Sequence, residues 1–139
     1  MKITFDANSM KLMSMFESMT LARLKDCFEN KGQMIFVVEE GEIRKALGKN
    51  ASNVKRIEDM LKKRIRVIEF SSDIVRFVRN VIMPNKAEDI TYTDGIITIT
   101  PTDQKSRGFL IGRAAEILRN NEEIVKRYYS ELKEIKILD

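Results

Sequence analysis

The chain contains no histidine and only one cysteine, Cys27, among its 139 residues. Without histidine, neither a Ser-His-Asp site nor a Cys-His site can form, and zinc sites built from cysteine and histidine are excluded. We expect no metal and no cofactor, and we expect Cys27 to be a small buried hydrophobic residue. The remaining catalytic candidates are unpaired carboxylates such as Asp94 and Asp103, which suit turns and helix caps better. The composition therefore argues against an enzyme.

Long apolar runs and aromatic residues are also scarce. No run approaches the roughly 18 apolar residues of a membrane span, and the first six residues lack the apolar core of a secretory signal. We therefore expect a soluble, cytoplasmic protein that makes no contact with a membrane. Tryptophan is absent and aromatic residues make up only 7% of the chain. This composition disfavours a recognition surface built on aromatic stacking.

What the sequence does contain is a repeat. The segments Ala46–Ala51 and Leu110–Ala115 are both apolar-apolar-Gly-basic turns that end on a small residue and open a helical stretch. Their glycines, Gly48 and Gly112, lie 64 positions apart (112 − 48 = 64). The segments around them recur in the same order. The repeat predicts two units, residues 1–71 and 72–139, each near the lower size limit for independent folding.

In each unit the pattern predicts helix, strand, strand, helix, glycine turn, helix and strand. In the first unit, a methionine-rich stripe at helical spacing (Met10, Met13, Phe16) predicts a helix whose methionines fill the core. The apolar run Ile35–Val38 belongs to a hairpin around Asn30-Lys31-Gly32. The other elements expected there are a short helix over 42–47, a helix with Val54, Ile57 and Leu61 that Ser52 or Asn53 caps, and a strand over 64–68.

In the second unit, Ser72 or Asp73 caps a helix that ends at Ile82, because Pro84 follows. Asp94-Gly95 is the strongest hairpin signal in the chain and joins strands over 90–93 and 96–100. The other elements expected there are a short helix over 103–111, a helix with Ile117, Leu118, Ile124, Val125 and Tyr128, and a strand over 134–138. We predict an α+β fold in which each unit is a three-stranded sheet with helices on one face, and an extra strand over 2–5.

Positive charge is concentrated around the first glycine turn. The net charge of the chain is +4, yet residues 43–66 alone hold nine lysines and arginines against Glu58 and Asp59. We therefore expect a polyanion to meet the protein at this turn. The alternative is that these charges form only a solvated helix face.

A glycine turn that leads into a helix presents unpaired backbone N–H groups at the positive end of the helix dipole. The missing side chain at Gly48 and Gly112 should let a phosphate-sugar backbone approach, with Lys49 and Arg113 in contact with phosphate. Leu47, Val54, Ile111 and Leu118 would form an apolar floor for unstacked bases. The candidate RNA-binding residues are Arg44, Lys45, Gly48, Lys49, Asn50, Ala51, Val54, Lys55, Arg56, Gly112, Arg113, Ala114, Ala115 and Leu118.

This order of elements around an Ile/Leu-Gly-x-x turn resembles a type II KH domain. The segment 36–42 that runs into 46–56, together with Lys25-Asp26-Cys27 and residues 103–115, resembles the archaeal NusA-like family over nearly the whole chain. The resemblance implies two tandem type II KH domains that bind single-stranded RNA in transcription elongation and termination. RNA polymerase or its transcripts are further partners that it implies. The alternative is a protein-interaction adaptor on RNA polymerase or a ribosomal assembly.

The chain departs from this family at the fourth turn position, which is glycine there and Ala51 or Ala115 here. Alanine is poor at positive φ, so each turn must either use helical geometry or accept strain. The segment Asn120-Asn121-Glu122-Glu123 follows the second turn, and its acidic pair should repel a nearby phosphate. We therefore expect the first unit to make the stronger RNA contact.

Overall fold

The computed structural model describes residues 7–139, which divide into two compact units at Ser71 and Ser72. The strand expected over 2–5 lies outside the described residues. Each unit is described by itself below. Within residues 7–139, no helix is both long enough and apolar enough to cross a membrane.

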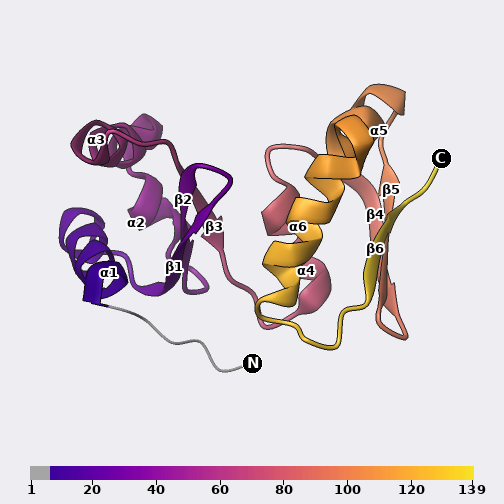
Figure 1. Ribbon diagram of the computed structural model, residues 1–139, viewed down its shortest axis with the longest axis horizontal. Coiled ribbons are helices and arrows are strands. Elements are labelled where there is room, and N and C mark those ends of the chain that lie inside the picture. Colours follow the sequence, from indigo (N-terminus) through magenta and orange to yellow (C-terminus); the bar gives the residue numbers. More distant parts are fainter. Residues whose placement is uncertain (1–6) are drawn as a thin grey trace. The chain divides into compact units, whose positions relative to one another are not determined.

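The first unit is a three-stranded sheet with helices on one face (Figure 1). Its sheet order is β1-β2-β3, with β1 antiparallel and β3 parallel to the central strand β2. The parallel pair requires a crossover, and α2, the glycine turn and α3 supply it. The elements are α1 (Ala7–Thr20), β1 (Leu24–Asn30), β2 (Gln33–Val38), α2 (Ile43–Leu47), the 3-10 turn η1 (Lys49–Ala51), α3 (Ser52–Leu61) and β3 (Ile65–Glu69).

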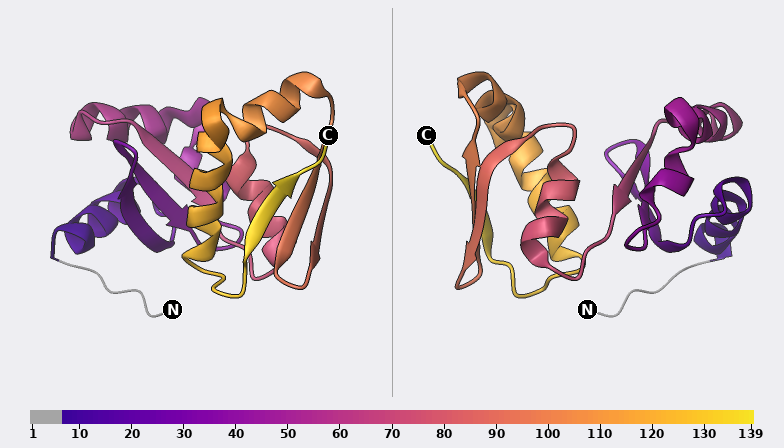
Figure 2. Two further views of the ribbon diagram at one scale, coloured as in Figure 1. Left: turned by 45° about the vertical axis from the view of Figure 1, so that its right-hand side comes forward. Right: turned by 180° about the vertical axis from the view of Figure 1, so that it is seen from behind.

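The second unit repeats this architecture with sheet order β4-β5-β6. Again the first pair of strands is antiparallel and the second pair is parallel, and Figure 2 shows the helices on a single face. The elements are α4 (Ile74–Ile82), β4 (Ala87–Thr93), β5 (Ile96–Pro101), α5 (Gln104–Ile111), the 3-10 turn η2 (Arg113–Ala115), α6 (Glu116–Lys126) and β6 (Glu134–Ile137). The predicted α+β fold class and the predicted order of elements are confirmed.

Each core lies between the helices and the covered face of the sheet. In the first unit, Phe16 of α1 stacks on Phe36 of β2 with ring centroids 4.4 Å apart, and Cys27 is buried beside them as expected. The expectation that the methionines of α1 fill the core holds for some of them only. Met13 packs against the core, whereas Met10 is 60% exposed.

In the second unit, Phe77 of α4 contacts two tyrosines that follow α6. Its ring centroid lies 5.4 Å from that of Tyr128 and 5.9 Å from that of Tyr129. Tyr128 was expected inside the helix, but α6 ends at Lys126. The strand expected to begin at Ile90 begins at Ala87, because an irregularity between Ala87 and Asp89 breaks the alternation of buried and exposed residues there.

One cap prediction is wrong. The residue that caps α3 is Ala51, in a left-handed conformation and without a side-chain hydrogen bond, rather than Ser52 or Asn53. The Asn53 side chain instead donates from Nδ2 to the carbonyl oxygen of Lys45 (3.0 Å), so it ties the start of α3 back to α2.

Candidate nucleic-acid interface

The two glycine turns have nearly the same backbone conformation. The φ/ψ values are 72°/178° at Gly48 and 75°/178° at Gly112, 55°/34° at Asn50 and 53°/32° at Ala114, and 58°/29° at Ala51 and 61°/23° at Ala115. The sequences Lys-Asn-Ala and Arg-Ala-Ala therefore adopt one shape. Since Asn50 and Ala114 differ in chemistry, the shape is set by the glycine and by the packing of the flanking helices.

Of the two alternatives for the alanines, the turns take the strained one. Ala51 and Ala115 both lie in the left-handed region, each directly after another left-handed residue. An L-residue there costs about 1–2 kcal/mol relative to glycine. The surrounding structure holds the turn in this shape in spite of that strain.

The space into which a side chain at each glycine would point is occupied by the protein's own side chains. A Cβ added to Gly48 would lie 2.8 Å from Asn53 Nδ2, and one added to Gly112 would lie 2.7 Å from Ile117 Cγ1. The missing side chain therefore allows the second helix to pack closely against the turn. Both glycines remain half-buried, so their other side stays partly open to solvent.

The groups that do face outward are the two residues after each glycine. Within the described chain, the N–H groups of Gly48, Ala51 and Ser52 close the first turn by donating to the carbonyl oxygens of Arg44 (3.0 Å), Gly48 (3.3 Å) and Lys49, respectively. Gly112, Ala115 and Glu116 do the same in the second turn, with Gly108 (2.9 Å), Gly112 (3.3 Å) and Arg113 as acceptors. The N–H groups of Lys49 and Asn50, and of Arg113 and Ala114, take no part in these bonds. All four residues are exposed.

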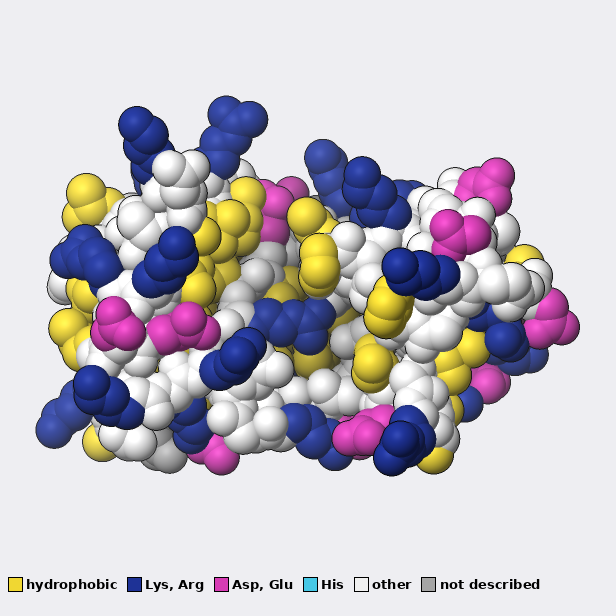
Figure 3. All heavy atoms as spheres, turned by 90° about the horizontal axis from the view of Figure 1, so that it is seen from above, with side chains coloured by type: hydrophobic (Ala, Val, Ile, Leu, Met, Phe, Trp, Pro, Cys, Tyr) yellow, Lys and Arg dark blue, Asp and Glu magenta, His cyan; other side chains and the backbone are white. Residues whose placement is uncertain are grey.

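The first turn is surrounded by cations that have no counter-ion among residues 7–139. Arg44, Lys49, Lys55 and Arg56 are exposed, and none of them pairs with a carboxylate there. On the face shown in Figure 3, basic side chains predominate over acidic ones on the first unit. This part of the predicted site therefore has the electrostatics that a polyanion needs.

Lys45 differs from its neighbours because Glu42 compensates its charge. Lys45 Nζ lies 3.6 Å from Glu42 Oε2, and the other carboxylate oxygen, Oε1, accepts the backbone N–H of Arg23 (2.8 Å). That backbone hydrogen bond, assisted by the charges of Lys45 and Arg23, lowers the pKa of Glu42 below its ordinary value of 4.5. Glu42 therefore stays ionised and holds α2 against the start of β1.

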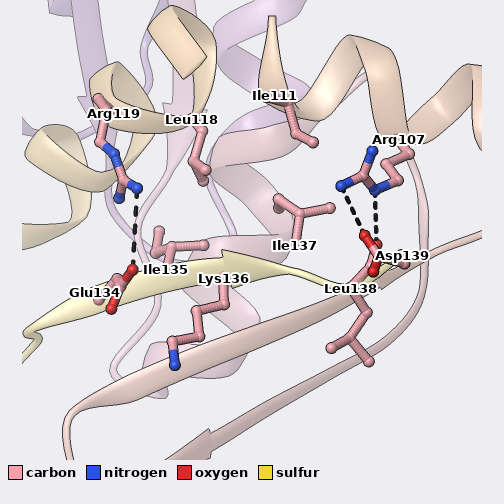
Figure 4. Close-up of a pocket in the computed structure, with 10 residues that line it drawn as sticks. All are labelled: Arg107, Ile111, Leu118, Arg119, Glu134, Ile135, Lys136, Ile137, Leu138 and Asp139. Carbon is pink, nitrogen blue, oxygen red and sulfur yellow. Dashed lines mark hydrogen bonds and ion pairs between the residues drawn. The ribbon is translucent and has the colours of Figure 1, made fainter. Parts of the chain in front are cut away.

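Beside the second turn, a groove of about 390 Å³ lies between α5, α6 and β6 (Figure 4). Ile111 and Leu118 on the helices face Ile135 and Ile137 on the strand and form an apolar floor. Leu118 is only 8% exposed, so it contributes an edge of this floor rather than a projecting side chain.

Two arginine–carboxylate pairs stand at the ends of this groove. Arg107 donates to the carbonyl oxygen of Leu138 (3.0 Å) and to Asp139 Oδ1 (3.0 Å), and Arg119 Nη2 lies 3.9 Å from Glu134 Oε1 (Figure 4). The sequence analysis missed Arg107 and the strand residues. No sequence signal identifies them, because they meet the helices only through the position of β6 in the folded sheet.

Glu122 is not the free negative charge that its position in the sequence suggested. Its side chain is buried, Oε2 accepts the backbone N–H of Ile135 (2.8 Å), and Arg119 and Lys126 lie 2.9 and 3.6 Å away. The expected repulsion of phosphate by an acidic pair is therefore reduced to Glu123, which is exposed. Glu58, 64 residues earlier, binds the N–H of Ile65 in the same way (3.0 Å).

The first unit has residues equivalent to those of the groove. Leu47 and Val54 lie 64 positions before Ile111 and Leu118. On the strands, Val67 pairs with Phe36 and Ile137 pairs with Ile99. Phe36 and Ile99 each lie four residues after the hairpin glycine of their unit, so Val67 and Ile137 are equivalent. These three first-unit side chains are half-buried, so they could form a similar apolar floor.

No family model matches the chain. A protein of Methanococcus vannielii named "Probable transcription termination protein NusA" is 37% identical over 90 residues, which are 65% of this chain and 52% of that protein. Proteins of the same name from Halococcus morrhuae and Methanocaldococcus jannaschii are 25% and 26% identical, over 93% and 99% of this chain and 94% and 76% of their own lengths. The chain is an archaeal NusA-like protein. It spans about half the length of the Methanococcus vannielii relative.

A solved structure has the same fold. The crystal structure of the protein APE1850 superposes with a TM-score of 0.76 at 24% sequence identity, and the match covers 96% of this chain and all of that one. This NusA-like protein therefore has the fold expected from its resemblance to tandem KH domains.

In the NusA-like chain, the predicted site residues fall into separate groups. The turn residues lie beside the cations of their unit, and the glycines and alanines shape the turns. Leu118 lies on the floor of the groove beside the second turn, and Val54 has the equivalent sequence position in the first unit. Within residues 7–139, no three histidine, cysteine, aspartate or glutamate side chains gather at a position that could hold a metal ion.

Proposed function

We propose that the protein is a single-stranded RNA-binding transcription factor that acts in elongation or termination. The names of its relatives support a role in transcription. One observation supports the RNA-binding part: two turns of different sequence share one strained shape, and each has an exposed cation and two exposed residues whose backbone N–H groups take no part in closing the turn. Residues 1–71 and 72–139 would each act as one KH unit. No step of this function requires catalysis.

In the first unit, a phosphate would bind to the N–H groups of Lys49 and Asn50 and to the Lys49 ammonium group. The turn leads into the N-terminus of α3, whose dipole favours an anion at this place. Lys55, Arg56 and Arg44 would add attraction without sequence preference, and displaced counterions would make binding dependent on salt. Bases next to this phosphate would reach the floor that contains Val54.

In the second unit, Arg113 and the N–H group of Ala114 would hold the phosphate. An adjacent base would enter the 390 Å³ groove and rest on the apolar floor that Ile111 and Leu118 form. Arg107 and Arg119 stand at the groove ends and carry N–H donors that could bind base edges. Because carboxylates already pair with both arginines, they would contribute less to phosphate attraction than the cations of the first unit.

The test is the double variant Lys49→Asp/Asn50→Asp, measured by fluorescence anisotropy with a single-stranded oligoribonucleotide at several salt concentrations. Asn50 has φ 55°, and aspartate tolerates the left-handed region as asparagine does, so the turn should keep its shape. We expect binding to weaken by about tenfold or more. The slope of log affinity against log salt should fall by about one unit, because one phosphate contact is lost.

The matched control is Lys31→Asp/Gln33→Glu at the β1–β2 hairpin of the same unit. It changes the net charge by the same three units, and Lys31 is also exposed with positive φ. If this control weakens RNA binding as much as the turn variant does, net charge rather than the turn holds the RNA, and the clamp is refuted.

A protein-interaction adaptor is the second candidate function, favoured by the carboxylate pairing of Arg107 and Arg119 in the second unit. The same turn variant distinguishes the two. An adaptor would bind its protein partner unchanged after Lys49 and Asn50 are replaced, and the unaltered chain would show no salt-dependent affinity for single-stranded RNA.

A further inference from the structure

Two large hydrophobic side chains beside the second turn are exposed to solvent. Phe109, near the end of α5, is 52% exposed, and Ile117, at the start of α6, is 43% exposed. The residues 64 positions earlier are Lys45 and Asn53, so the first turn carries polar groups at the same two places. The difference between the turns is therefore chemical and not conformational.

Both side chains belong to the surroundings of Gly112, which ends α5. In the first unit, Asn53 Nδ2 bonds to the carbonyl oxygen of Lys45, which shows that the side chain at this position reaches the preceding helix. The second turn has the same backbone and the same glycine-to-helix hydrogen bond, and Ile117 takes the place of Asn53 against the glycine. Ile117 therefore lies at the C-terminal end of α5, and Phe109 is three residues before that end. Together, Phe109 and Ile117 are called the apolar flank below.

The apolar flank lies outside the groove. Arg107 and Ile111 line the groove from α5. At 100° per residue, Phe109 points about 200° away from each of them, toward the other side of the helix. Phe109 is also three residues before Gly112, so it lies on the same side of the helix as the turn. An RNA strand held at Arg113 would thus have the groove on one side and the apolar flank on the other.

We propose that the apolar flank is a stacking site for one base of single-stranded RNA, taken from a nucleotide beyond the segment that enters the groove. This inference rests on the proposed function. The base would stack on the ring of Phe109 and contact the side chain of Ile117 with one of its edges. The scarcity of aromatic residues in the chain excludes a platform of several rings, but one exposed ring suffices for one base.

The size of the apolar flank favours a base over a protein partner. A specific protein interface buries roughly 800 Å² on each side, whereas two side chains match a single planar base. The neighbouring Arg113 is exposed and has no counter-ion within residues 7–139, so the adjacent phosphate would have its cation. A protein partner is an outcome that the experiment can reveal.

The experiment compares the unaltered chain with Phe109→Leu and Phe109→Trp, using oligoadenylate and oligouridylate of equal length and fluorescence anisotropy. Leucine keeps an apolar side chain and removes the ring. Adenine stacks better than uracil, so the stacking site should contribute to a preference for oligoadenylate. We expect Phe109→Leu to bind oligoadenylate about tenfold more weakly, to lose most of this preference, and to keep the salt slope unchanged. Phe109→Trp should bind at least as well as the unaltered chain.

Met10→Ala removes an equally exposed hydrophobic side chain from α1 and serves as the control. If the unaltered chain binds RNA and Phe109→Leu leaves both affinity and base preference unchanged, the stacking site is refuted while the clamp stands. If Phe109→Leu instead abolishes binding of RNA polymerase and leaves RNA affinity unchanged, the flank is a protein-docking surface. If the unaltered chain binds neither RNA, the proposed function and the stacking site fail together.

Discussion

Replacement of Gly48 by alanine should destabilise the first unit through packing and backbone strain, without any RNA present. The φ/ψ pair of 72°/178° belongs to a region that only glycine occupies readily, and another residue there costs about 1–3 kcal/mol. The new Cβ would lie 2.8 Å from Asn53 Nδ2, so Asn53 must move and lose its hydrogen bond to Lys45, at about 1 kcal/mol. The two effects together predict a loss of about 2–4 kcal/mol.

Gly41→Ala separates these effects. Gly41 also has positive φ (84°), but a Cβ there would meet nothing within 4 Å, so its cost is confined to about 1–2 kcal/mol of backbone strain. In the double variant Gly48→Ala/Asn53→Ala, the conflict with Asn53 is gone, whereas the backbone strain and a 3.1 Å approach to Ser52 Oγ remain. Its stability relative to Asn53→Ala alone therefore measures the cost that remains without the Asn53 contact, which is chiefly backbone strain.

In the second unit, two glycine-to-alanine substitutions should change stability in opposite directions. A Cβ on Gly112 would lie 2.7 Å from Cγ1 and 3.0 Å from Cβ of Ile117, whose β-branched side chain has little rotamer freedom. Gly112→Ala should therefore cost at least as much as Gly48→Ala. Gly108 has no positive φ and an open environment inside α5, so Gly108→Ala should stabilise the unit by up to about 1 kcal/mol.

The assay is urea unfolding of the full chain, followed by NMR signals assigned to each unit, because two units need not unfold together. The reasoning is refuted if Gly48→Ala is no more destabilising than Gly41→Ala. It is also refuted if Gly112→Ala and Gly108→Ala change stability in the same direction. Either result would mean that the turn relaxes freely around a Cβ and that Asn53 and Ile117 do not hold its shape.

Two further predictions concern the turn alanines and the capping carboxylate. Ala51→Gly and Ala115→Gly should each raise stability by up to about 1 kcal/mol in the same urea assay, because glycine removes the left-handed strain; a loss of stability would contradict the assigned conformation. For Glu42, whose pKa is lowered on folding, the stabilisation is present above pH 4.5 and is lost as the pH falls through the folded pKa. Glu42→Gln should therefore melt earlier than the unaltered chain at neutral pH, and this difference in melting temperature should shrink as the pH is lowered below 4.5, as scanning calorimetry would show.

The order of elements could be predicted from the sequence because each element carries a local signal. The hairpin at Asp94-Gly95 and the end of α4 before Pro84 depend on turn chemistry and on proline, which act within a few residues. The start of β4 at Ala87 could not be found in this way. There the backbone irregularity breaks the two-residue alternation on which strand prediction depends.

The candidate site was predictable as a position but not as a geometry. The repeat located both turns, yet it could not reveal that Asn53 and Ile117 fill the space beside the glycines, since that contact depends on how the two helices cross. Glu122 illustrates the same limit. Its neighbours in sequence suggest a repulsive charge, but its partner Ile135 lies 13 residues away, on a strand that only the fold brings near.

The repeat preserves the shape of the turn and changes what surrounds it. In the first unit, all the cations next to the turn except Lys45 lack a carboxylate partner within the described chain. In the second unit, Arg107 and Arg119 are paired and Phe109 replaces Lys45. If one RNA strand binds both turns, the salt dependence should arise mainly from the first and the base preference mainly from the second. Charge substitutions at the first turn should then change the salt dependence, because ion release depends on unpaired cations. Substitutions of the Phe109 ring should change the base preference, because stacking does not depend on those cations.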